Sequence, residues 1–288
     1  MSACGGTACG LLVFPMFRFT KMNGAGNDFV LVDNRSGSVR LDTAQIARLC
    51  DRHRGVGADG LLLLETARGN GDFRMRYYNA DGGEAEMCGN GARCFARFAQ
   101  RTAGLGDRVA FETPAGLIRA RLHGELVTLD MSDPTGLELH AALAVGDLAL
   151  TVHSLNTGVP HAVVLVEDLE QVDVARLGNA LRFHPHFAPK GTNVNFAQAL
   201  APDAIAIRTY ERGVEGETLA CGTGVCAAAI LFSHLTGGGE AISVRVRGGD
   251  TLQVGFRRSG DTFGEVTLTG PADFVFEGEL ALEPVTVG

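Results

Sequence analysis

Two cysteines, Cys88 and Cys221, each stand at a glycine turn that leads directly into a predicted helix. The first turn reads Cys-Gly-Asn-Gly and the second reads Cys-Gly-Thr-Gly. Free N–H groups and the positive end of the dipole at a helix start lower the pKa of a thiol, and they bind anions such as carboxylates. Each turn could therefore hold both a reactive sulfur and the carboxylate of a substrate.

Two such turns that face each other would present one sulfur to each side of a bound Cα atom. A thiolate on one side would remove the α-proton, and a thiol on the other side would deliver a proton to the opposite face. Because like charges at close range raise one pKa, the two sulfurs are expected to titrate as a pair, with one thiolate at a time. This arrangement inverts a stereocentre by acid and base chemistry alone.

An internal repeat surrounds the two cysteines. The chain reads FRMRYYNADGGEAEMCGNGARCFA around Cys88 and IAIRTYERGVEGETLACGTGVCAAA around Cys221, 133 positions later. Upstream, MNGAGNDFVLVDN places Asn27 61 residues before the first cysteine, and LNTGVPHAVVLVED places His161 60 residues before the second. A duplicated domain is the simplest account of this self-similarity.

The same order of elements is predicted in both halves. In the first half the patterns predict strands at about 17–21 and 29–34, a helix at about 43–52, and two strands at about 60–65 and 72–79. In the second half they predict a strand at about 161–166, a helix at about 173–182, and two strands at about 193–198 and 204–209. A second helix follows from about Asn90 or Thr223; the first has Phe95, Phe98 and Ala99 on one face, and the second reads GVCAAAILF. Helices of this kind are buried.

Alternating runs such as GLIRARLHG, ELVTLDM, ISVRVRG and EVTLTG have the period of half-buried antiparallel strands. We therefore expect an α+β fold of two similar domains related by a pseudo-twofold axis, each a curled β-sheet or barrel around a central helix. The first half is expected over residues 16–130 and the second over 131–270, with SDPTG after Met131 as a linker. Residues 1–15 are expected to be a disordered extension, because they lack the features of a signal peptide.

Composition narrows the class of protein. With 45% hydrophobic and 20% charged residues the chain is typical of a soluble protein, and no stretch of eighteen apolar residues exists. A net charge of −8 without a basic run argues against nucleic acid as a partner. Seven scattered cysteines, an odd number, indicate reduced thiols and a cytoplasmic protein rather than a disulfide framework.

Cofactor and metal chemistry are both disfavoured. Pyridoxal phosphate needs a lysine for its Schiff base, and the chain has only Lys21 and Lys190. A zinc site is considered because four residues separate Cys221 from Cys226, but the spacing differs in the other half and the second cysteine lies within a predicted helix. We expect neither a cofactor nor a metal.

Six motifs in one order identify a known family. They are KMNGAGNDF, DRHRGVGADG, NADG…CGNGARC, GVPH, KGTNVNF and ERGVEGETLACGTG, and over about residues 16–275 they closely resemble diaminopimelate epimerases. The resemblance implies two similar domains with one catalytic cysteine in each and no metal or cofactor. The substrate that it implies is a small-molecule amino acid, diaminopimelate, whose LL and meso forms would be interconverted. It also implies a homodimer and a final segment, residues 271–288, that returns to the first domain.

The resemblance also assigns roles to single residues. Cys88 and Cys221 are the acid and base, with His161 and Glu211 as polar supports that tune the thiols. The substrate is also expected to contact Glu211. Its reacting carboxylate is expected to bind the backbone of Gly89, Asn90, Gly222 and Thr223. Its distal amino-acid end is expected to contact Asn27, Asn79, Asn193 and Arg212. One position departs from the family pattern: Val159 stands where many members have an asparagine, and it cannot donate the amide hydrogen bond.

Other interpretations stay open on residue type alone. His161 suits a buried core histidine, Glu211 and Arg212 suit a solvated ion pair, and asparagines beside glycines suit turns. Another two-cysteine racemase, acting on proline or hydroxyproline, has a similar architecture, although Asn193 and Arg212 favour a substrate with a second polar head. A dithiol redox protein is disfavoured because no Cys-x-x-Cys is present. A binding module that holds an anion at the helix starts is the third alternative.

Overall fold

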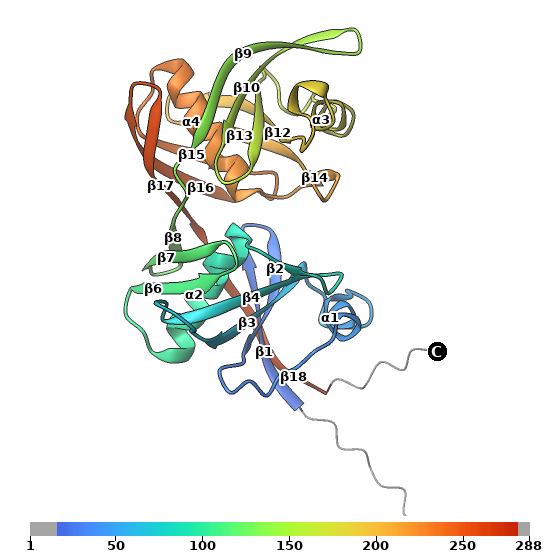
Figure 1. Cartoon of the computed structure of the whole chain (residues 1–288), viewed down its shortest axis with the longest axis vertical. Helices are drawn as coiled ribbons and strands as arrows, with labels where there is room; N and C mark the ends of the chain where they lie inside the picture. The colour runs from blue at the N-terminus through green and yellow to red at the C-terminus, as the bar shows by residue number, and fades with distance from the viewer. Residues whose placement is uncertain (1–15, 282–288) are drawn as a thin grey trace, which may run out of the picture.

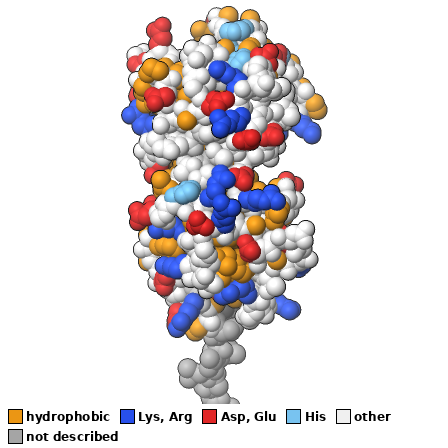
Figure 2. Space-filling view, turned by 90° about the vertical axis from the view of Figure 1, so that its left-hand side faces the viewer, with side chains coloured by type: hydrophobic (Ala, Val, Ile, Leu, Met, Phe, Trp, Pro, Cys, Tyr) orange, Lys and Arg blue, Asp and Glu red, His pale blue; other side chains and the backbone are white. Residues whose placement is uncertain are grey.

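The computed structural model describes residues 16–281 and shows two lobes stacked along the long axis of the molecule (Figure 1). The predicted extension at residues 1–15 lies outside the described residues. Charged side chains of both signs are interspersed on the face shown in Figure 2. Among the described residues, no helix is long and apolar enough to cross a membrane.

The first lobe is built around one central helix, α2. Its elements are β1 (Met16–Gly24), β2 (Asn27–Asp33), α1 (Thr43–Cys50), β3 (Gly60–Thr66), β4 (Phe73–Asn79), β5 (Glu84–Ala85), α2 (Gly89–Ala103), β6 (Arg108–Thr113), β7 (Gly116–His123) and β8 (Leu126–Asp130). Strands β2 and β3 pair in parallel, as do β4 and β6, and the other neighbours in this lobe are antiparallel.

The second lobe repeats this order after an added strand. Its elements are β9 (Thr135–Val145), β10 (Leu148–Asn156), β11 (Pro160–Leu165), α3 (Val174–Arg182), a short 3₁₀ helix (Pro185–Phe187), β12 (Asn193–Ala201), β13 (Ala204–Glu211), β14 (Gly216–Thr218), α4 (Gly222–Thr236), β15 (Ala241–Arg245), β16 (Thr251–Ser259) and β17 (Thr262–Pro271). Here too two pairs are parallel, β11 with β12 and β13 with β15. The predicted α+β fold of two similar curled sheets around central helices is confirmed.

The two lobes exchange strands at their boundary. Strand β8 pairs with β17, so the sheets form one continuous ladder. The last strand, β18 (Asp273–Ala281), runs antiparallel to β1, and Met16 lies opposite Ala281. Strand β9 pairs with β10 in the corresponding place of the second lobe. The division at residues 130 and 131 stays a prediction, because this shared ladder has no break there.

The hairpin β9–β10 was not predicted, and the SDPTG linker was placed too far along the chain. Thr135 and Gly136 already belong to β9. The signal was present, since Leu137, Leu139 and Leu143 alternate with more exposed residues along this strand. The Pro-Thr-Gly sequence suggested a turn, but pairing with β10 overrides this local preference.

Burial of the two central helices follows their sequences. In α2, Phe95, Phe98 and Ala99 are buried in the core of the first lobe, as predicted. In α4 every residue from Gly224 to Ser233 is buried, which explains why this helix is apolar nearly all round. Because each helix is enclosed by its own sheet, its first turn is held in a fixed place at the boundary between the lobes.

Candidate active site

Each of the two cysteines is the N-cap residue of a central helix. Cys88 precedes α2 and Cys221 precedes α4, both with extended backbone and without a side-chain hydrogen bond that caps the helix. Helices are usually capped there by Ser, Thr, Asp or Asn, which use up an orphan N–H group. The first-turn N–H groups therefore remain available to a sulfur or to a ligand anion.

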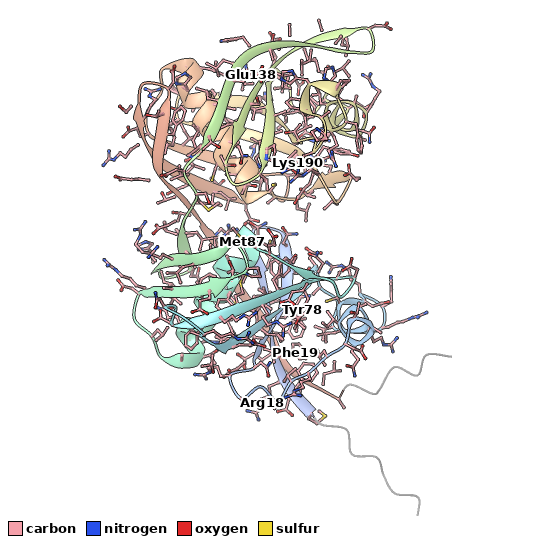
Figure 3. All side chains as sticks on the ribbon, viewed as in Figure 1. Arg18, Phe19, Tyr78, Met87, Glu138 and Lys190 are labelled. Atoms are coloured by element: carbon pink, nitrogen blue, oxygen red, sulfur yellow. The ribbon has the colours of Figure 1, made fainter. Side chains whose placement is uncertain are left out.

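The two helix starts face each other across the lobe boundary. A β-carbon added to Gly222 would lie 3.9 Å from the Cα atom of Gly89, so these first turns approach each other closely. Figure 3 labels Met87, the residue before Cys88, at this boundary. Cys88 is partly exposed, whereas Cys221 is buried. The predicted convergence of the two turns on one place is thus observed.

Both thiols have raised pKa values. Burial raises the pKa of Cys88, and the N–H groups of Gly91 and Asn90 act in the opposite direction. Burial also raises the pKa of Cys221 to about 12, and the hydroxyl of Thr223 and the N–H of Gly224 oppose it. Burial therefore favours the protonated form of both sulfurs, and a positive charge nearby would shift either of them toward the thiolate.

Glu211, at the end of β13, raises the pKa of both cysteines through its negative charge. Burial raises the pKa of Glu211 itself, while the nearby Thr218 hydroxyl acts in the opposite direction. A single carboxyl group thus acts on both sulfurs, from the end of β13, which pairs with the strand β14 that precedes the Cys221 turn. The sequence placed Glu211 at this site, and the structure brings it there.

His161 lies in a chain of hydrogen bonds that ends at Cys221. Its Nε2 atom is 2.9 Å from Oγ1 of Thr223, and that hydroxyl is 3.6 Å from the sulfur of Cys221. On the other side of the ring, Nδ1 is 3.2 Å from Nδ2 of Asn195. Asn195 also accepts a hydrogen bond from Oγ1 of Thr209 at 2.9 Å, so its amide N–H₂ must face the imidazole.

This orientation decides the tautomer of His161. Because Nδ1 accepts from Asn195, the ring proton is on Nε2, and Nε2–H donates to the hydroxyl of Thr223. Burial lowers the pKa of His161 to about 3, and the charge of Arg212 adds to this effect. The imidazole is therefore neutral at physiological pH and acts as a fixed dipole that leaves the Thr223 hydroxyl proton free for the sulfur.

Asn27 and Asn90 occupy the corresponding places beside Cys88. Nδ2 of Asn90 donates to Oδ1 of Asn27 at 2.6 Å and to the carbonyl of Ala220 at 3.3 Å. Asn27 in turn donates to Asp59 at 2.8 Å. Since Ala220 directly precedes Cys221, Asn90 links the helix start of one lobe to the cysteine turn of the other.

Asn193 and Arg212 lie side by side, where β12 begins and just after β13 ends. Oδ1 of Asn193 accepts a hydrogen bond from the backbone N–H of Arg212 at 2.8 Å, and its Nδ2 donates to the carbonyl of Pro160 at 3.1 Å. The Arg212 guanidinium contacts the carbonyl of Lys190 at 3.4 Å. No carboxylate within residues 16–281 pairs with this guanidinium, which leaves it available to a ligand carboxylate.

The remaining predicted residue, Asn79, is separate from these networks. It is exposed at the end of β4, where its backbone forms a turn with Gly82 and Gly83. Its side chain makes no hydrogen bond to another residue of the described range. A role of Asn79 in binding stays a prediction.

Sequence reasoning missed three residues that position the site: Asp59, Asn195 and Thr209. The first two lie inside motifs already noted, DRHRGVGADG and KGTNVNF, but nothing in those motifs shows which side chain is buried. Alternation was the one available signal, because Asn193 and Asn195 are two positions apart on a strand and share a face. Thr209 had no signal, since a buried threonine in a strand is ordinary.

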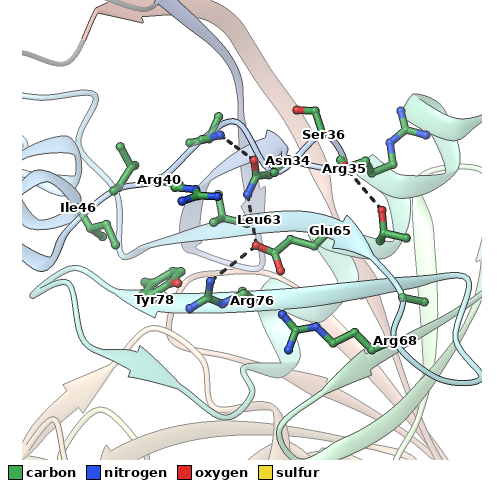
Figure 4. Close-up of a pocket in the computed structure, with 15 residues that line it drawn as sticks. Asn34, Arg35, Ser36, Arg40, Ile46, Leu63, Glu65, Arg68, Arg76 and Tyr78 are labelled. Atoms are coloured by element: carbon green, nitrogen blue, oxygen red, sulfur yellow. Dashed lines mark hydrogen bonds and ion pairs between the residues drawn. The ribbon is translucent and has the colours of Figure 1, made fainter.

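A cavity of the first lobe lies elsewhere. A hollow of about 660 Å³ opens on the first lobe beside β3 and β4, and Figure 4 shows Asn34, Glu65 and Arg76 within it. Glu65 accepts a hydrogen bond from Asn34 at 3.2 Å and lies 3.7 Å from Arg76. None of the residues predicted for the site lines this hollow. Over residues 16–281, no group of three or more His, Cys, Asp or Glu side chains is arranged to hold a metal ion.

Comparison with known sequences gives the family. The family model for diaminopimelate epimerase matches residues 19–136 and 153–275. The diaminopimelate epimerase of Aquifex aeolicus (strain VF5) is 44% identical over 278 residues, covering 92% of this chain and 98% of the relative. The chain belongs to the diaminopimelate epimerase family. Another relative of that name, from Chlorobaculum tepidum, is 44% identical, with 91% of this chain and 100% of the relative covered.

Solved structures share the two-lobed fold at low identity. A phenazine biosynthesis protein of the PhzF family from Bacillus anthracis superposes with a TM-score of 0.69 at 17% identity, covering 93% of this chain and 100% of that protein. A probable proline racemase from Agrobacterium radiobacter K84 with bound carbonate also gives 0.69, at 19% identity and 94% coverage of both chains. Members of the diaminopimelate epimerase family thus share their architecture with proteins of other names.

Proposed function

We propose that this protein is a diaminopimelate epimerase that interconverts LL- and meso-2,6-diaminopimelate, a step toward lysine and cell-wall precursors, by two-base cysteine chemistry. The observation that carries the proposal is the meeting of two cysteine N-caps, Cys88 and Cys221, whose following glycines face each other across the lobe boundary. Membership of the family supports diaminopimelate as the substrate.

The chemistry follows from that geometry. In one direction the thiolate of one cysteine takes the α-proton and becomes a thiol, which leaves a carbanion at Cα. The thiol of the other cysteine then gives its proton to the opposite face of Cα and becomes a thiolate. Each turnover moves one proton onto one sulfur and one proton off the other, so no cofactor or metal is required for the balance. We expect incubation with EDTA to leave the activity unchanged.

The carboxylate at the reacting end would bind the free N–H groups of the two helix starts, at Gly89, Asn90, Gly222 and Thr223. Such binding places the α-carbon between the sulfurs. The substrate's α-ammonium group would also add the positive charge that the raised thiol pKa values require. Glu211 lies near both sulfurs and is suited to receive that ammonium group.

The distal amino-acid end would bind farther from the sulfurs. Arg212, which is free of carboxylate partners in the described residues, suits the distal carboxylate, and Asn193 holds the backbone of Arg212 in place. Asn27 and Asn79 are proposed to contact the same end. A proline or hydroxyproline racemase would have no distal end for these groups to bind, so Arg212 favours the longer substrate.

The first test follows exchange of the α-hydrogen. The protein is incubated with LL-diaminopimelate in deuterated water, and we expect deuterium at Cα together with the meso isomer. Incubation with proline and with trans-4-hydroxyproline tests the alternative. Exchange with either of these amino acids, and none with diaminopimelate, would contradict the proposed substrate.

The second test assigns the two sulfurs. Replacing Cys88 or Cys221 with alanine should abolish epimerisation, because the carbanion can no longer be reprotonated on the new face. Replacement with serine should leave only a trace, since a hydroxyl group is far less acidic than a thiol. With substrates that carry a β leaving group, each single variant should still eliminate from one stereoisomer, and the two variants should prefer opposite isomers. Cys50→Ala, a buried cysteine outside the site, is the control; near-normal epimerisation without Cys88 or Cys221 would refute the mechanism.

Assembly and location are further parts of the proposal. We infer a cytoplasmic homodimer, as the family resemblance suggests. Strand β18 supports an interface, because Val275 is 56% exposed and Phe276 is 48% exposed on this edge of the first lobe. Light scattering of the purified protein would measure the mass directly, and a monomer at micromolar concentration would contradict this proposal.

A further inference from the structure

Arg93 is a buried cation directly behind the site. It lies in α2, five positions after Cys88, with no exposed surface. Its Nη2 atom donates to Oδ1 of Asn90 at 2.9 Å and to the carbonyl of Gly24 at 3.4 Å, and its Nε donates to the carbonyl of Pro271 at 3.2 Å. Its Nη1 atom is buried and has no hydrogen-bond partner within the described residues. No carboxylate there forms an ion pair with it.

A buried guanidinium without a counter-ion is costly, because it loses hydration and gains no full ionic partner. The fold nevertheless makes room for it. A β-carbon on Gly270 would lie 3.1 Å from Nε of Arg93, and one on Gly24 would lie 2.7 Å from the carbonyl of Asn90. The fold therefore places this charge where β1, α2 and the β17–β18 connection meet. A function of the charge would explain why its unfavourable burial is retained.

The second half has no such cation. The residue five positions after Cys221 is Cys226, a buried and neutral thiol. Arg93 lies in the helix that Cys88 caps and donates to Asn90, two positions after that cysteine, at 2.9 Å. Burial is the largest influence on the Cys88 pKa, and the positive charge of Arg93 is a smaller one that favours the thiolate. The main influences on Cys221 are its burial, the carboxyl of Glu211, the Thr223 hydroxyl, the N–H of Gly224 and the Cys88 sulfur. The repeat is symmetric in its backbone but asymmetric in this charge.

The other groups near the two sulfurs do not reverse the difference. Glu211 acts on both cysteines in the same direction, against the thiolate. The Tyr77 phenol, from β4, interacts with Cys88, but burial raises its pKa, so it remains neutral. The titratable groups that interact with Arg93 itself are Cys94, Cys88, Cys226 and, in the turn between β15 and β16, Asp250. Burial raises the pKa of Cys94 and of Cys226 to about 12, so Asp250 is the carboxylate among these groups.

We propose that Arg93 is a positioning residue that makes Cys88, rather than Cys221, the sulfur that gives up its proton first. The inference rests on the proposed two-cysteine function and deepens it. Arg93 acts by its fixed positive charge and by its hydrogen bond to Oδ1 of Asn90, which turns the amide N–H₂ of Asn90 toward Asn27 and Ala220. The free enzyme is thereby prepared for the stereoisomer whose α-hydrogen faces Cys88.

The same asymmetry favours the return of the thiolate to Cys88 between turnovers. After Cys88 has taken a proton from the substrate and Cys221 has given one up, the thiolate is on Cys221. Before the same stereoisomer can react again, a proton must leave Cys88 for solvent and another must reach Cys221. Arg93 makes this exchange favourable, because it stabilises the charge on Cys88 relative to the charge on Cys221.

The test measures alkylation of each sulfur without substrate, so it does not depend on epimerase activity. Iodoacetamide at low conversion transfers its carbamoylmethyl group to a thiolate and releases iodide, and peptide mapping by mass spectrometry gives separate initial rates for Cys88 and Cys221. Rates are taken from about pH 6.5 up to the highest pH at which the protein stays folded, and they are compared as profiles, which removes differences in intrinsic nucleophilicity. In the wild type we expect the rate of Cys88 to rise at lower pH than that of Cys221.

Variants of Arg93 separate charge from packing. Arg93→Met should move the Cys88 profile about one pH unit upward, a tenfold change in thiolate fraction, and leave the Cys221 profile in place. Arg93→Lys should restore most of the wild-type order because it keeps the charge. Arg101→Met, which removes an exposed arginine from the same helix two turns later, is the matched control and should change neither profile.

Three results would overturn the proposal. One is a wild-type profile in which Cys221 ionises at or below the pH of Cys88, and this result does not depend on any variant folding. Another is a folded Arg93→Met protein, verified by thermal melting, with an unchanged Cys88 profile. The third is an Arg93→Lys protein that behaves like Arg93→Met. Loss of epimerase activity in all proteins would count against the proposed function but leave these profiles interpretable.

Discussion

Gly89 and Gly222 meet at the boundary between the lobes, where a β-carbon on Gly222 would lie 3.9 Å from the Cα atom of Gly89. Each glycine directly follows a cysteine, so the two cysteine N-caps are held beside the same point. Two helices from different lobes thus direct their positive ends toward each other, which is unfavourable unless an anion occupies the space between them. The bound carboxylate of an amino acid meets that need.

Mild oxidation should inactivate the enzyme reversibly by forming a disulfide bond between Cys88 and Cys221. Their positions beside Gly89 and Gly222 allow the sulfurs to meet after a modest movement of the lobes. Peptide mapping without reductant should identify the crosslink, and a thiol reductant should restore activity. Cys88→Ala should form no such crosslink. Inactivation by oxidant without a peptide joining the two cysteines would show that the sulfurs do not face each other.

Two equivalent glycines should respond differently to alanine. Gly91 and Gly224 each lie three positions after a catalytic cysteine, but a β-carbon on Gly224 would be 2.3 Å from Oδ1 of Asn195, whereas one on Gly91 would be 3.4 Å from the ring of Phe29. Gly224→Ala should therefore lose most turnover and about 2 kcal/mol of stability. Gly91→Ala should stay within about 1 kcal/mol of the wild type, since alanine favours helices. Thermal or urea unfolding with parallel kinetics checks both, and equal effects would contradict this packing.

Thr209 should affect turnover although two hydrogen bonds, which pass through Asn195, separate it from the His161 ring. Thr209→Val removes the donor to Asn195, so the amide can turn and the tautomer of His161 is no longer fixed. We expect kcat to fall about tenfold with little change in KM, and stability to fall by about 1–3 kcal/mol. Thr128→Val breaks another threonine hydrogen bond, to Thr269 at 2.7 Å, and should cost stability without reducing kcat. A normal kcat in Thr209→Val would remove Asn195 from the positioning chain.

Stability should fall in mild acid because of His161. Its pKa is about 3 in the folded protein, against an ordinary value of 6.5. The unfolded chain therefore binds more protons between these values, and the free energy of unfolding decreases as the pH falls from about 6.5 toward 3, by at most about 1.4 kcal/mol per pH unit. His161→Gln should show a shallower dependence between pH 4.5 and 6.5, whereas replacing the exposed His53 with glutamine should not. Parallel curves for His161→Gln and the wild type would mean that His161 is not buried in its neutral form.

The sequence by itself determined the chemistry and the duplication. Cys88 and Cys221, their glycine turns and the repeated motifs are local patterns, so they predict helix starts, reactive sulfurs and two similar halves without any knowledge of contacts. Six motifs in order also determined the family. The hairpin β9–β10 could have been predicted from its alternation, but the turn residues at its start suggested a linker instead.

The tertiary structure decided how these pieces act on one another. Asn90 reaches Ala220, Asn195 orients His161, and Arg93 is fully buried in the helix that Cys88 caps. Each of these relationships joins residues whose burial or partner depends on how distant strands and helices pack. A residue type shows which hydrogen bonds or charges are available, but only packing decides which partner satisfies them and how far water is excluded. The sequence shows arginine at position 93 and cysteine at the equivalent position 226, but only the tertiary structure shows that the arginine is buried beside Asn90.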